Sequence, residues 1–304
     1  MNPARRRLLE LGALAPLCAC TPAVKESDPI AAAMRRIEPL FLRKIPPHPG
    51  DWLAEHKEAG QTYRQFRATV QARAIDSYTT LRIVPIGPLS EGQQGVLSVV
   101  TDIMQPFFGL PLEMDPPVEL DSIPDDAQRL VFEQFGHKQL LTTYLLNTAL
   151  MSRRRPGDAA VLGITGYDLW PGPGWNFVFG QASLRERVGV WSMARSGNTD
   201  EGPEMLKLCA IRTVRTAMHE TGHMFGIRHC IAYECGMNGS NHSEERDRQP
   251  LEFCPECQAK LWWTLGLDPL ARSRALAEIT RRHGFEGTAA NLAKQSAALA
   301  NLAH

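Results

Sequence analysis

The sequence predicts a mixed α/β (α+β) domain. Short apolar runs bounded by glycine or proline, such as residues 81–86 and 159–164, predict buried strands. Between these runs lie segments with apolar residues at helical spacing, such as residues 91–106. Strands that alternate with helices are typical of this fold class. The chain has 304 residues, of which 43% are hydrophobic and 22% charged, so it has enough apolar material for a sizeable core.

Residues 1–20 differ from the rest of the chain. Three arginines at 5–7 precede a short apolar run that ends near Cys20. This order is typical of a secretory signal, and the arginines resemble a twin-arginine export motif. The residues before Cys20 resemble a lipobox, so we expect a periplasmic or membrane-anchored lipoprotein with Cys20 lipidated. The alternative is a frayed N-terminal helix of a cytoplasmic protein, which Glu10 and Pro16 favour.

The remaining elements follow from two periodicities, short apolar runs for strands and a 3.6-residue repeat for helices. Residues 21–45 predict a tether with a helical piece, and residues 46–80 have a polar helical pattern. The predicted strands are residues 81–86, 111–120, 159–164, 176–180 and 188–192. The predicted helices are residues 91–106, 126–152, 205–225 and 271–300. The expected units are 1–20 (signal), 21–80 (tether and N-terminal helical region), 81–270 (the main domain) and 271–304 (an Ala-rich helical tail).

Charge and hydropathy argue against two functional classes. Lys and Arg together number 33, as do Asp and Glu, so the formal net charge is zero. Nucleic-acid-binding proteins usually have a basic excess, and we therefore expect no nucleic-acid partner. No uninterrupted apolar stretch reaches the roughly 18 residues of an ordinary membrane-spanning helix. We expect the protein to be a monomer.

Three histidines have the spacing of a metal site. His219 and His223 are four residues apart in a helical pattern, so both imidazoles project from one helix face. Gly226 is a plausible helix C-cap that lets the chain turn and bring His229 back toward them. Three neutral imidazoles with one open position make a catalytic zinc site. Glu220, between the first two histidines, can accept a proton from zinc-activated water.

A cysteine cluster follows the histidines. Cys230 and Cys235 precede a tight C-x-x-C formed by Cys254 and Cys257. Two cysteine pairs of this kind predict a tetrahedral structural zinc. Two disulfides, or a redox-active Cys254–Cys257 pair, are the alternatives that an oxidising compartment favours. Twin-arginine export moves folded proteins, so metals bound before export are compatible with it. Cys209 is expected to be a small buried residue.

These motifs resemble those of the archaemetzincins, a metzincin-like family of zinc metallopeptidases. The resemblance rests on residues 219–229, on the four cysteines and on Met237. It further includes residues 50–53, 60–62, 164–165, 168–169 and 176–180. The similarity thus spans roughly residues 46–265. The export signal is not what the resemblance leads us to expect, which affects the predicted localisation and not the predicted chemistry.

The resemblance implies a metzincin-like mixed β-sheet with the active-site helix packed under it. It implies two zinc ions per chain, one catalytic and one structural, and a peptide or protein substrate. Glu220 is implied as general base and acid, and Met237 as the methionine beneath the catalytic metal. The implied ligands are His219, His223 and His229 for the catalytic zinc and Cys230, Cys235, Cys254 and Cys257 for the structural zinc.

Two other functions compete with a peptidase. One is a non-catalytic zinc-binding lipoprotein in which the metals are structural, and the other is a thiol–disulfide protein that uses Cys254 and Cys257. Glu220 argues against the former, because a purely structural site has no need of an acid there. The C-x-x-C lacks the strand and helix context of a thioredoxin-like site, which argues against the latter.

A few further residues have two interpretations each. Asp168 is either a hydrogen-bond partner of a zinc ligand or a turn residue, and His242 is expected to be a solvated loop residue. Phe177 and Phe179 are expected in the core. An edge strand here would offer its backbone to an extended peptide at Asn176, Val178 and Gly180.

Overall fold

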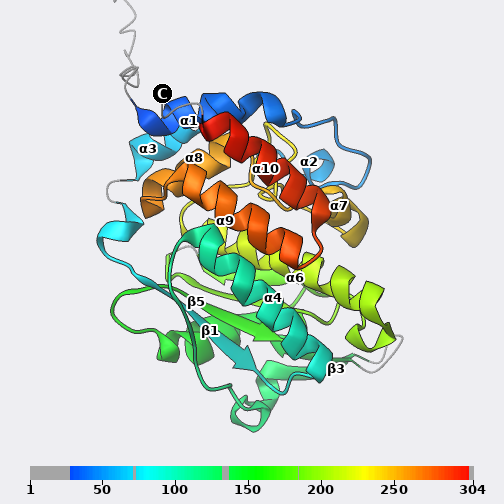
Figure 1. Ribbon diagram of the computed structural model, residues 1–304. Coiled ribbons are helices and arrows are strands. Elements are labelled where there is room, and N and C mark those ends of the chain that lie inside the picture. Colours follow the sequence, from blue (N-terminus) through cyan, green and yellow to red (C-terminus); the bar gives the residue numbers. More distant parts are fainter. Residues whose placement is uncertain (1–27, 71–72, 132–136, 184, 301–304) are drawn as a thin grey trace, which may run out of the picture.

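The computed structural model describes residues 28–70, 73–131, 137–183 and 185–300, arranged in layers (Figure 1). A β-sheet forms one side of the molecule, two long helices cover one face of this sheet, and a further group of helices packs beyond them. Residues 1–20, with the expected export signal and Cys20, lie outside the described residues.

The main sheet has five strands in the order β2-β1-β5-β8-β7. Neighbouring strands are parallel except for β7, which runs antiparallel to β8 at one edge. The expected strands at 81–86, 159–164 and 188–192 are confirmed, whereas those at 111–120 and 176–180 are shorter or displaced. The strands are β1 (Thr80–Ile86), β2 (Leu112–Met114), β5 (Asp158–Thr165), β7 (Gly180–Ser183) and β8 (Val188–Ser192).

The central strand β5 is buried along its whole length, so its apolar residues face two separate clusters. Leu162 and Ile164 pack with α4 (Glu91–Phe108) and α6 (Pro203–Met224) on one face. Val161 packs on the other face with Leu146 and its neighbours. A parallel strand buried on both sides reads as a continuous apolar run, which explains why the sequence pattern identified it.

The expectation of one long helix over residues 126–152 is wrong. The segment forms β3 (Gln128–Val131), β4 (His137–Leu141), the short α5 (Thr142–Tyr144) and a π-helical stretch (Leu145–Leu150). The strands join β6 (Asp168–Trp170) in a second sheet ordered β3-β4-β6. Side-chain spacing alone cannot separate helix from strand in a short apolar run, and here the pairing with β6 determines the outcome.

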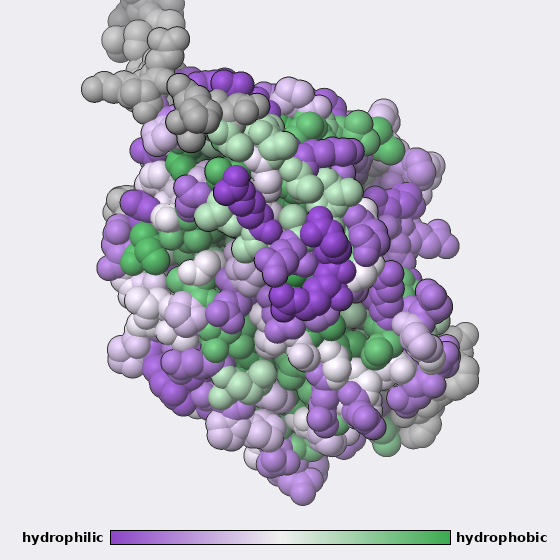
Figure 2. Space-filling view, viewed as in Figure 1, coloured by the Kyte–Doolittle hydropathy of each residue, from purple (hydrophilic) through white to green (hydrophobic). Residues whose placement is uncertain are grey.

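The third layer consists of helices from both ends of the described chain. Helix α1 packs against α8 and α10, and α9 packs against both α10 and α4. Figure 2 shows hydrophilic and apolar side chains intermixed on this part of the molecule, with pale green residues gathered in its upper part. No helix within the described ranges has both the length and the apolar character to cross a membrane. The helices not yet given are α1 (Pro29–Ile37), α2 (Trp52–Glu55), α3 (Tyr63–Thr69), α7 (Ser243–Arg248), α8 (Pro255–Leu265), α9 (Pro269–Arg282) and α10 (Glu286–Ala300).

A buried ion network joins β1 to β5. Arg82 on β1 donates two hydrogen bonds of 2.9 Å to Asp158 on β5 and one of 2.9 Å to Asp115. All three side chains are almost fully buried. Asp158 also accepts a hydrogen bond from the backbone N–H of Arg155. Because the charges are paired and hydrogen-bonded, their burial is tolerated inside the domain.

Candidate metal centres and active-site cleft

The end of α6 brings the third histidine back to the first two. The helix ends at Met224, and Gly226 has φ +81°, a conformation that disfavours residues with a side chain. The N–H of Ile227 then donates to the carbonyl oxygen of Gly222 at 3.2 Å, which closes the turn. His229 consequently lies beside His223, with ring centroids 4.9 Å apart. The glycine cap predicted from the sequence is confirmed.

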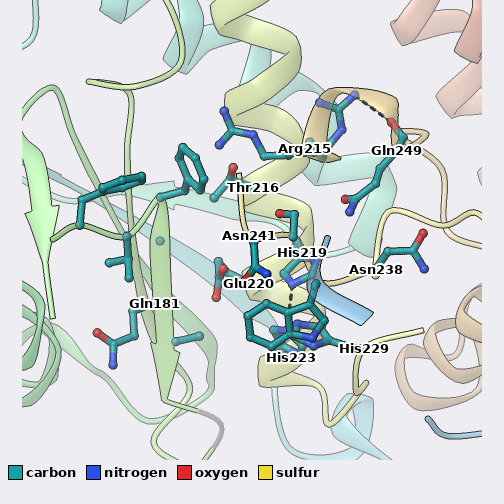
Figure 3. Close-up of a pocket in the computed structure, with 18 of the residues that line it drawn as sticks. Gln181, Arg215, Thr216, His219, Glu220, His223, His229, Asn238, Asn241 and Gln249 are labelled. Atoms are coloured by element: carbon teal, nitrogen blue, oxygen red, sulfur yellow. Dashed lines mark hydrogen bonds between the residues drawn. The ribbon is translucent and has the colours of Figure 1, made fainter. Parts of the chain in front are cut away.

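The three imidazoles converge on one point, which we call the three-histidine site: His219, His223 and His229. Figure 3 shows His223 and His229 beside each other, with His219 directed toward them. Each ring has one nitrogen fixed by an oxygen. Nδ1 of His219 lies 2.9 Å from the carbonyl oxygen of Gly236, and Nδ1 of His223 lies 2.7 Å from that of Ile227.

The oxygen partner of His229 comes from far away in the chain. Its Nδ1 lies 2.8 Å from Oε1 of Glu58, in the segment between α2 and α3. Trp52, on α2, packs edge-on against the same imidazole with ring centroids 5.2 Å apart. Sequence reasoning missed Glu58. The only signal near it was the resemblance at residues 50–53 and 60–62, which indicated that this segment matters without identifying the carboxylate.

The arrangement fits a bound cation. Carbonyl oxygens only accept hydrogen bonds, so Nδ1 of His219 and of His223 must carry the proton. Their Nε2 atoms then face each other with lone pairs at 3.0 Å, a repulsive contact that a metal ion between them would relieve. Two ligands 2.0–2.1 Å from a tetrahedral zinc ion are about 3.3 Å apart, close to this separation. Burial, with the neighbouring imidazoles, lowers the pKa of His219 and lowers that of His223 to about 4, which keeps both neutral.

Glu220 lies at the floor of a cleft of about 560 Å³ that the three imidazoles also line. Burial raises the pKa of its carboxyl group to about 7. A carboxyl group with a pKa near neutrality can both accept and release a proton, which is the property required of a general base that later acts as an acid. Figure 3 shows Glu220 beside the imidazoles, on the side of Thr216 and strand β7.

The second group of predicted ligands also converges. The sulfur atoms of the four-cysteine cluster (Cys230, Cys235, Cys254 and Cys257) all lie within 4.8 Å of one another. None of the four forms a disulfide, and the Sγ atoms of Cys230 and Cys254 are 3.6 Å apart. Four thiolates 2.3 Å from a tetrahedral zinc ion are about 3.8 Å apart, so the spacing fits a metal. The structure therefore favours a metal-binding cluster over the two-disulfide alternative.

Charge supports the same interpretation of the four-cysteine cluster. Hydrogen bonds from the neighbouring thiols, Cys235 first, lower the pKa of Cys230. Burial and the neighbouring sulfurs raise the pKa values of Cys235 and Cys254. A divalent ion would allow all four thiols to ionise, as zinc ligands do.

The turn between the cysteines supports both sites. Asn238 donates to the carbonyl oxygens of Cys230 and Tyr233, and its own carbonyl accepts from the N–H of Cys235. Met237 is buried beneath α6, where a side chain at Gly222 would place its Cβ 2.7 Å from the Met237 sulfur. The structure thus places Met237 beneath the helix that carries His219 and His223.

Other candidate residues lie outside the metal centres. Asp168 is bound by Arg195 through two hydrogen bonds of 2.9 and 2.8 Å and by Gln139, and it has no hydrogen bond to any of the predicted zinc ligands. Phe177 and Phe179 line the cleft, so the expectation that they belong to the core is wrong. The guanidinium of Arg195 stacks over the ring of Phe177, and that of Arg246 stacks over the ring of Phe179. Cys209 is fully buried, as expected.

A third group, Asp51, His242 and Glu245, is close enough to suggest a metal but is already used. Glu245 accepts from the backbone N–H of Trp52 and Asn241. Asp51 accepts from Arg248, and His242 accepts from the N–H of Glu245 at the start of α7. These contacts hold the segment around α2 against α7, which positions Trp52 at the cleft.

Known proteins resemble this chain along most of its length. The model of peptidase family M54 matches residues 158–262. Archaemetzincin-2 of Macaca fascicularis is 32% identical over 268 residues, covering 75% of this chain and 71% of that protein. The archaemetzincin of Thermococcus kodakarensis is 31% identical over 185 residues, covering 60% of this chain and 96% of that protein.

A solved structure shares the fold. The crystal structure of archaemetzincin from Methanopyrus kandleri superposes with a TM-score of 0.50 at 29% sequence identity. It covers 62% of this chain and 97% of the other. The matched length of the smaller protein indicates that its whole fold is contained within this larger chain.

Proposed function

The chain belongs to the archaemetzincin family and is a zinc-dependent metallopeptidase, and from this premise we propose that Glu220 acts as general base and acid at the three-histidine site. The observation that carries the proposal is the convergence of three oriented imidazoles beside a carboxyl group of raised pKa in one cleft. A reading in which both metals are structural is not favoured, because it leaves the carboxyl group without a role.

The chemistry divides between the metal and the side chains. Zinc held by the three imidazoles supplies a Lewis acid that lowers the pKa of water to about 7 and polarises a carbonyl group. Glu220 takes a proton from the attacking water onto its carboxylate and delivers it to the leaving amine nitrogen. The carbonyl oxygens of Gly236 and Ile227, together with Glu58, hold the imidazoles in orientation throughout.

The edge strand β7 supports peptide binding beside Glu220. Ser192 donates to the carbonyl oxygen of Phe179, so alternate residues, Gly180 and Ala182, direct their backbone groups outward. A Cβ at Gly180 would lie 3.2 Å from Glu220, which places this edge against the proton-transfer group. An extended peptide added to β7 would therefore present its carbonyl groups next to Glu220. The N–H of Val178, by contrast, is already bonded to Leu169.

The four-cysteine cluster is proposed to hold a second, structural zinc ion, which makes two per chain. Support comes from the sulfur spacing and from its closed set of four ligands, which leaves no position for water. The role of this zinc would be to fix the turn that carries Gly236, the partner of His219.

Export and lipidation at Cys20 are proposed on the sequence alone. The arginines at 5–7 and the lipobox-like residues support them. Mass spectrometry of the protein from its native host is the test, and an intact, unmodified Met1 on cytosolic protein would contradict the proposal. The monomeric state stays a prediction.

The variant Glu220→Gln tests the proposed role of Glu220. Gln is nearly isosteric and cannot accept the proton, so we expect bound zinc and fold to persist while hydrolysis of a susceptible peptide falls by about 10²–10⁴-fold. His223→Ala serves as the comparison, because it removes a ligand and should lower zinc content as well as activity. Cleavage by zinc-loaded Glu220→Gln at the wild-type rate would show that the carboxylate is not the base.

A further inference from the structure

Two buried arginines line the same cleft as the zinc ligands. Arg215 lies on α6 and is 7% exposed, and Arg246 lies on α7 and is 4% exposed. All three guanidinium nitrogens of Arg246 are buried without a hydrogen-bond partner among the described residues, and so are Nε and Nη1 of Arg215. Nη2 of Arg215 donates to the carbonyl oxygen of Gln249 at 3.0 Å.

The local charge does not balance. Arg212, Arg215 and Arg246 surround one carboxylate, Asp247. Arg212 binds Asp247 through its Nε and Nη2, while Nη1 of Arg215 approaches the same carboxylate to 3.6 Å. Glu252, the other acidic residue that acts on Arg215, is itself buried with a raised pKa. Among the residues that the structure describes, no carboxylate lies within ion-pair distance of Arg246, and Asp247 acts on it only at longer range.

Burial of an unpaired guanidinium is costly, and native proteins normally satisfy such donors. Burial lowers the pKa of Arg246 to about 10, so the group is still charged at neutral pH. Its guanidinium stacks over the ring of Phe179, with the central carbon 3.9 Å from the ring centroid. This contact fixes the guanidinium plane but supplies no acceptor. The donors therefore need an acceptor that enters from the cleft.

The position of the pair relates it to the reaction. Arg215 precedes His219 by one helical turn, about 6 Å along the axis of α6. Phe179, beneath Arg246, is followed directly by Gly180, which lies against Glu220. In Figure 3, Arg215 and Gln249 lie at one end of the pocket, and His223 and His229 lie at the other. A span of about 6 Å corresponds to about two residues of extended peptide.

We propose that Arg246 and Arg215 bind a carboxylate of the peptide substrate, within about two residues of the bond that is cleaved. The proposal rests on the peptidase function above and specifies its substrate class. Guanidinium and carboxylate groups form paired, charge-assisted hydrogen bonds, so a carboxylate satisfies the donors and the charge together. The carboxylate belongs either to an Asp or Glu side chain or to the C-terminus of the peptide.

Binding to zinc-loaded Glu220→Gln protein, measured by calorimetry, tests the proposal without hydrolysis. One set of amidated hexapeptides carries a single Glu at each position in turn, and a matched set carries Gln. A third peptide without Glu has a free C-terminus. We expect at least one carboxylate peptide to bind roughly 10- to 100-fold more tightly than its neutral counterpart. The set in which this preference appears identifies the source of the carboxylate.

Variants assign the preference to the arginines. Arg246→Met and Arg215→Met in the Glu220→Gln background retain side-chain length, and each should remove most of the preference. Arg185→Met is the charge-matched control, because the Arg185 side chain is 93% exposed in the turn after β7. It should bind like the parent protein. Zinc content and circular dichroism verify the fold of each variant. If Arg246→Met does not fold, Arg215→Met and Arg246→Lys test whether the arginines cause the carboxylate preference. Arg246→Lys keeps the charge but loses the paired geometry.

Two results would overturn the proposal. The first is equal binding of Glu and Gln peptides together with no effect of a free C-terminus. The second is a carboxylate preference that survives in the folded arginine variants, which would place the carboxylate on the zinc ion instead. The wild-type protein could also bind carboxylate peptides through these arginines and cleave none of them. That result would contradict only the peptidase mechanism, so failure of the mechanism can be distinguished from failure of the carboxylate-binding proposal.

Discussion

Glu58 is expected to control zinc affinity at the three-histidine site. Backbone carbonyl groups orient His219 and His223, and only His229 depends on another side chain, the Glu58 carboxylate at 2.8 Å. Carboxylate partners of this kind fix the imidazole tautomer and raise its basicity, and their loss typically weakens metal binding by about 10–100-fold.

Two substitutions at Glu58 separate the contribution of its charge from that of its hydrogen bond. Glu58→Gln retains an oxygen that can accept from Nδ1 but loses the charge, so we expect zinc affinity to fall about 10-fold, or about 1.4 kcal/mol. Glu58→Ala loses both, so we expect a fall near 100-fold, or about 2.7 kcal/mol. The partial exposure of the pair, 19% for His229 and 24% for Glu58, argues against a larger effect.

Competition with a chromogenic zinc chelator measures this affinity directly. Glu55→Ala is the matched control, because Glu55 carries the same charge three residues earlier and is exposed to solvent. It should change the zinc dissociation constant by less than about twofold. If Glu58→Ala binds zinc as tightly as the wild type, the carboxylate does not support His229 and the argument from orientation is wrong.

Three further predictions concern metal content and stability. We expect two zinc ions per chain, with the histidine-bound ion lost first under mild chelation, because three ligands and water hold zinc less firmly than four thiolates. Elemental analysis that finds one zinc ion per chain, in protein whose four cysteines form disulfides, would contradict this. Gly222→Ala should lower the free energy of unfolding by about 1–3 kcal/mol, because the added Cβ collides with Met237. Gly95→Ala on α4 should raise it by about 0.5–1 kcal/mol, because a Cβ there meets open space. Urea titration of both variants measures the two changes. Asp158→Ala should cost about 3–5 kcal/mol in the same assay, because it removes both hydrogen bonds from the buried Arg82 to Asp158 and leaves only Asp115 and Glu113 as carboxylate partners. A cost below about 1 kcal/mol would show that solvent reaches the pair.

Local spacing was sufficient to predict which histidines and cysteines converge. His219 and His223 share a helix face, and a glycine turn returns His229 after only a few residues, so short-range geometry determines their convergence. The two cysteine pairs are likewise close in sequence. The resemblance to a known family added the role of Met237, which no spacing rule would have assigned, to the roles that the residues themselves predicted for Glu220 and the two ligand sets.

Long-range contacts account for what the sequence did not reveal. Glu58 meets His229 across 171 residues of sequence, and no periodicity links two such positions. The unpaired donors of Arg246 become visible only when burial and hydrogen bonds are known. The wrongly predicted helix at 126–152 has the same origin: Leu140 and Leu141 fit both periodicities, and pairing of β4 with β6 decides between them.

The two candidate metal centres share one stretch of backbone. His229 is followed directly by Cys230, and the turn from Cys235 to Met237 carries Gly236, whose carbonyl oxygen orients His219. An ion at either centre restricts the same few dihedral angles, so occupancy of one lowers the conformational entropy lost when the other is filled. Such coupling is reciprocal, so each ion should increase the affinity of the other by the same factor. If both centres bind an ion, we expect the chain between the histidines and the cysteines to act as one cooperative binding unit.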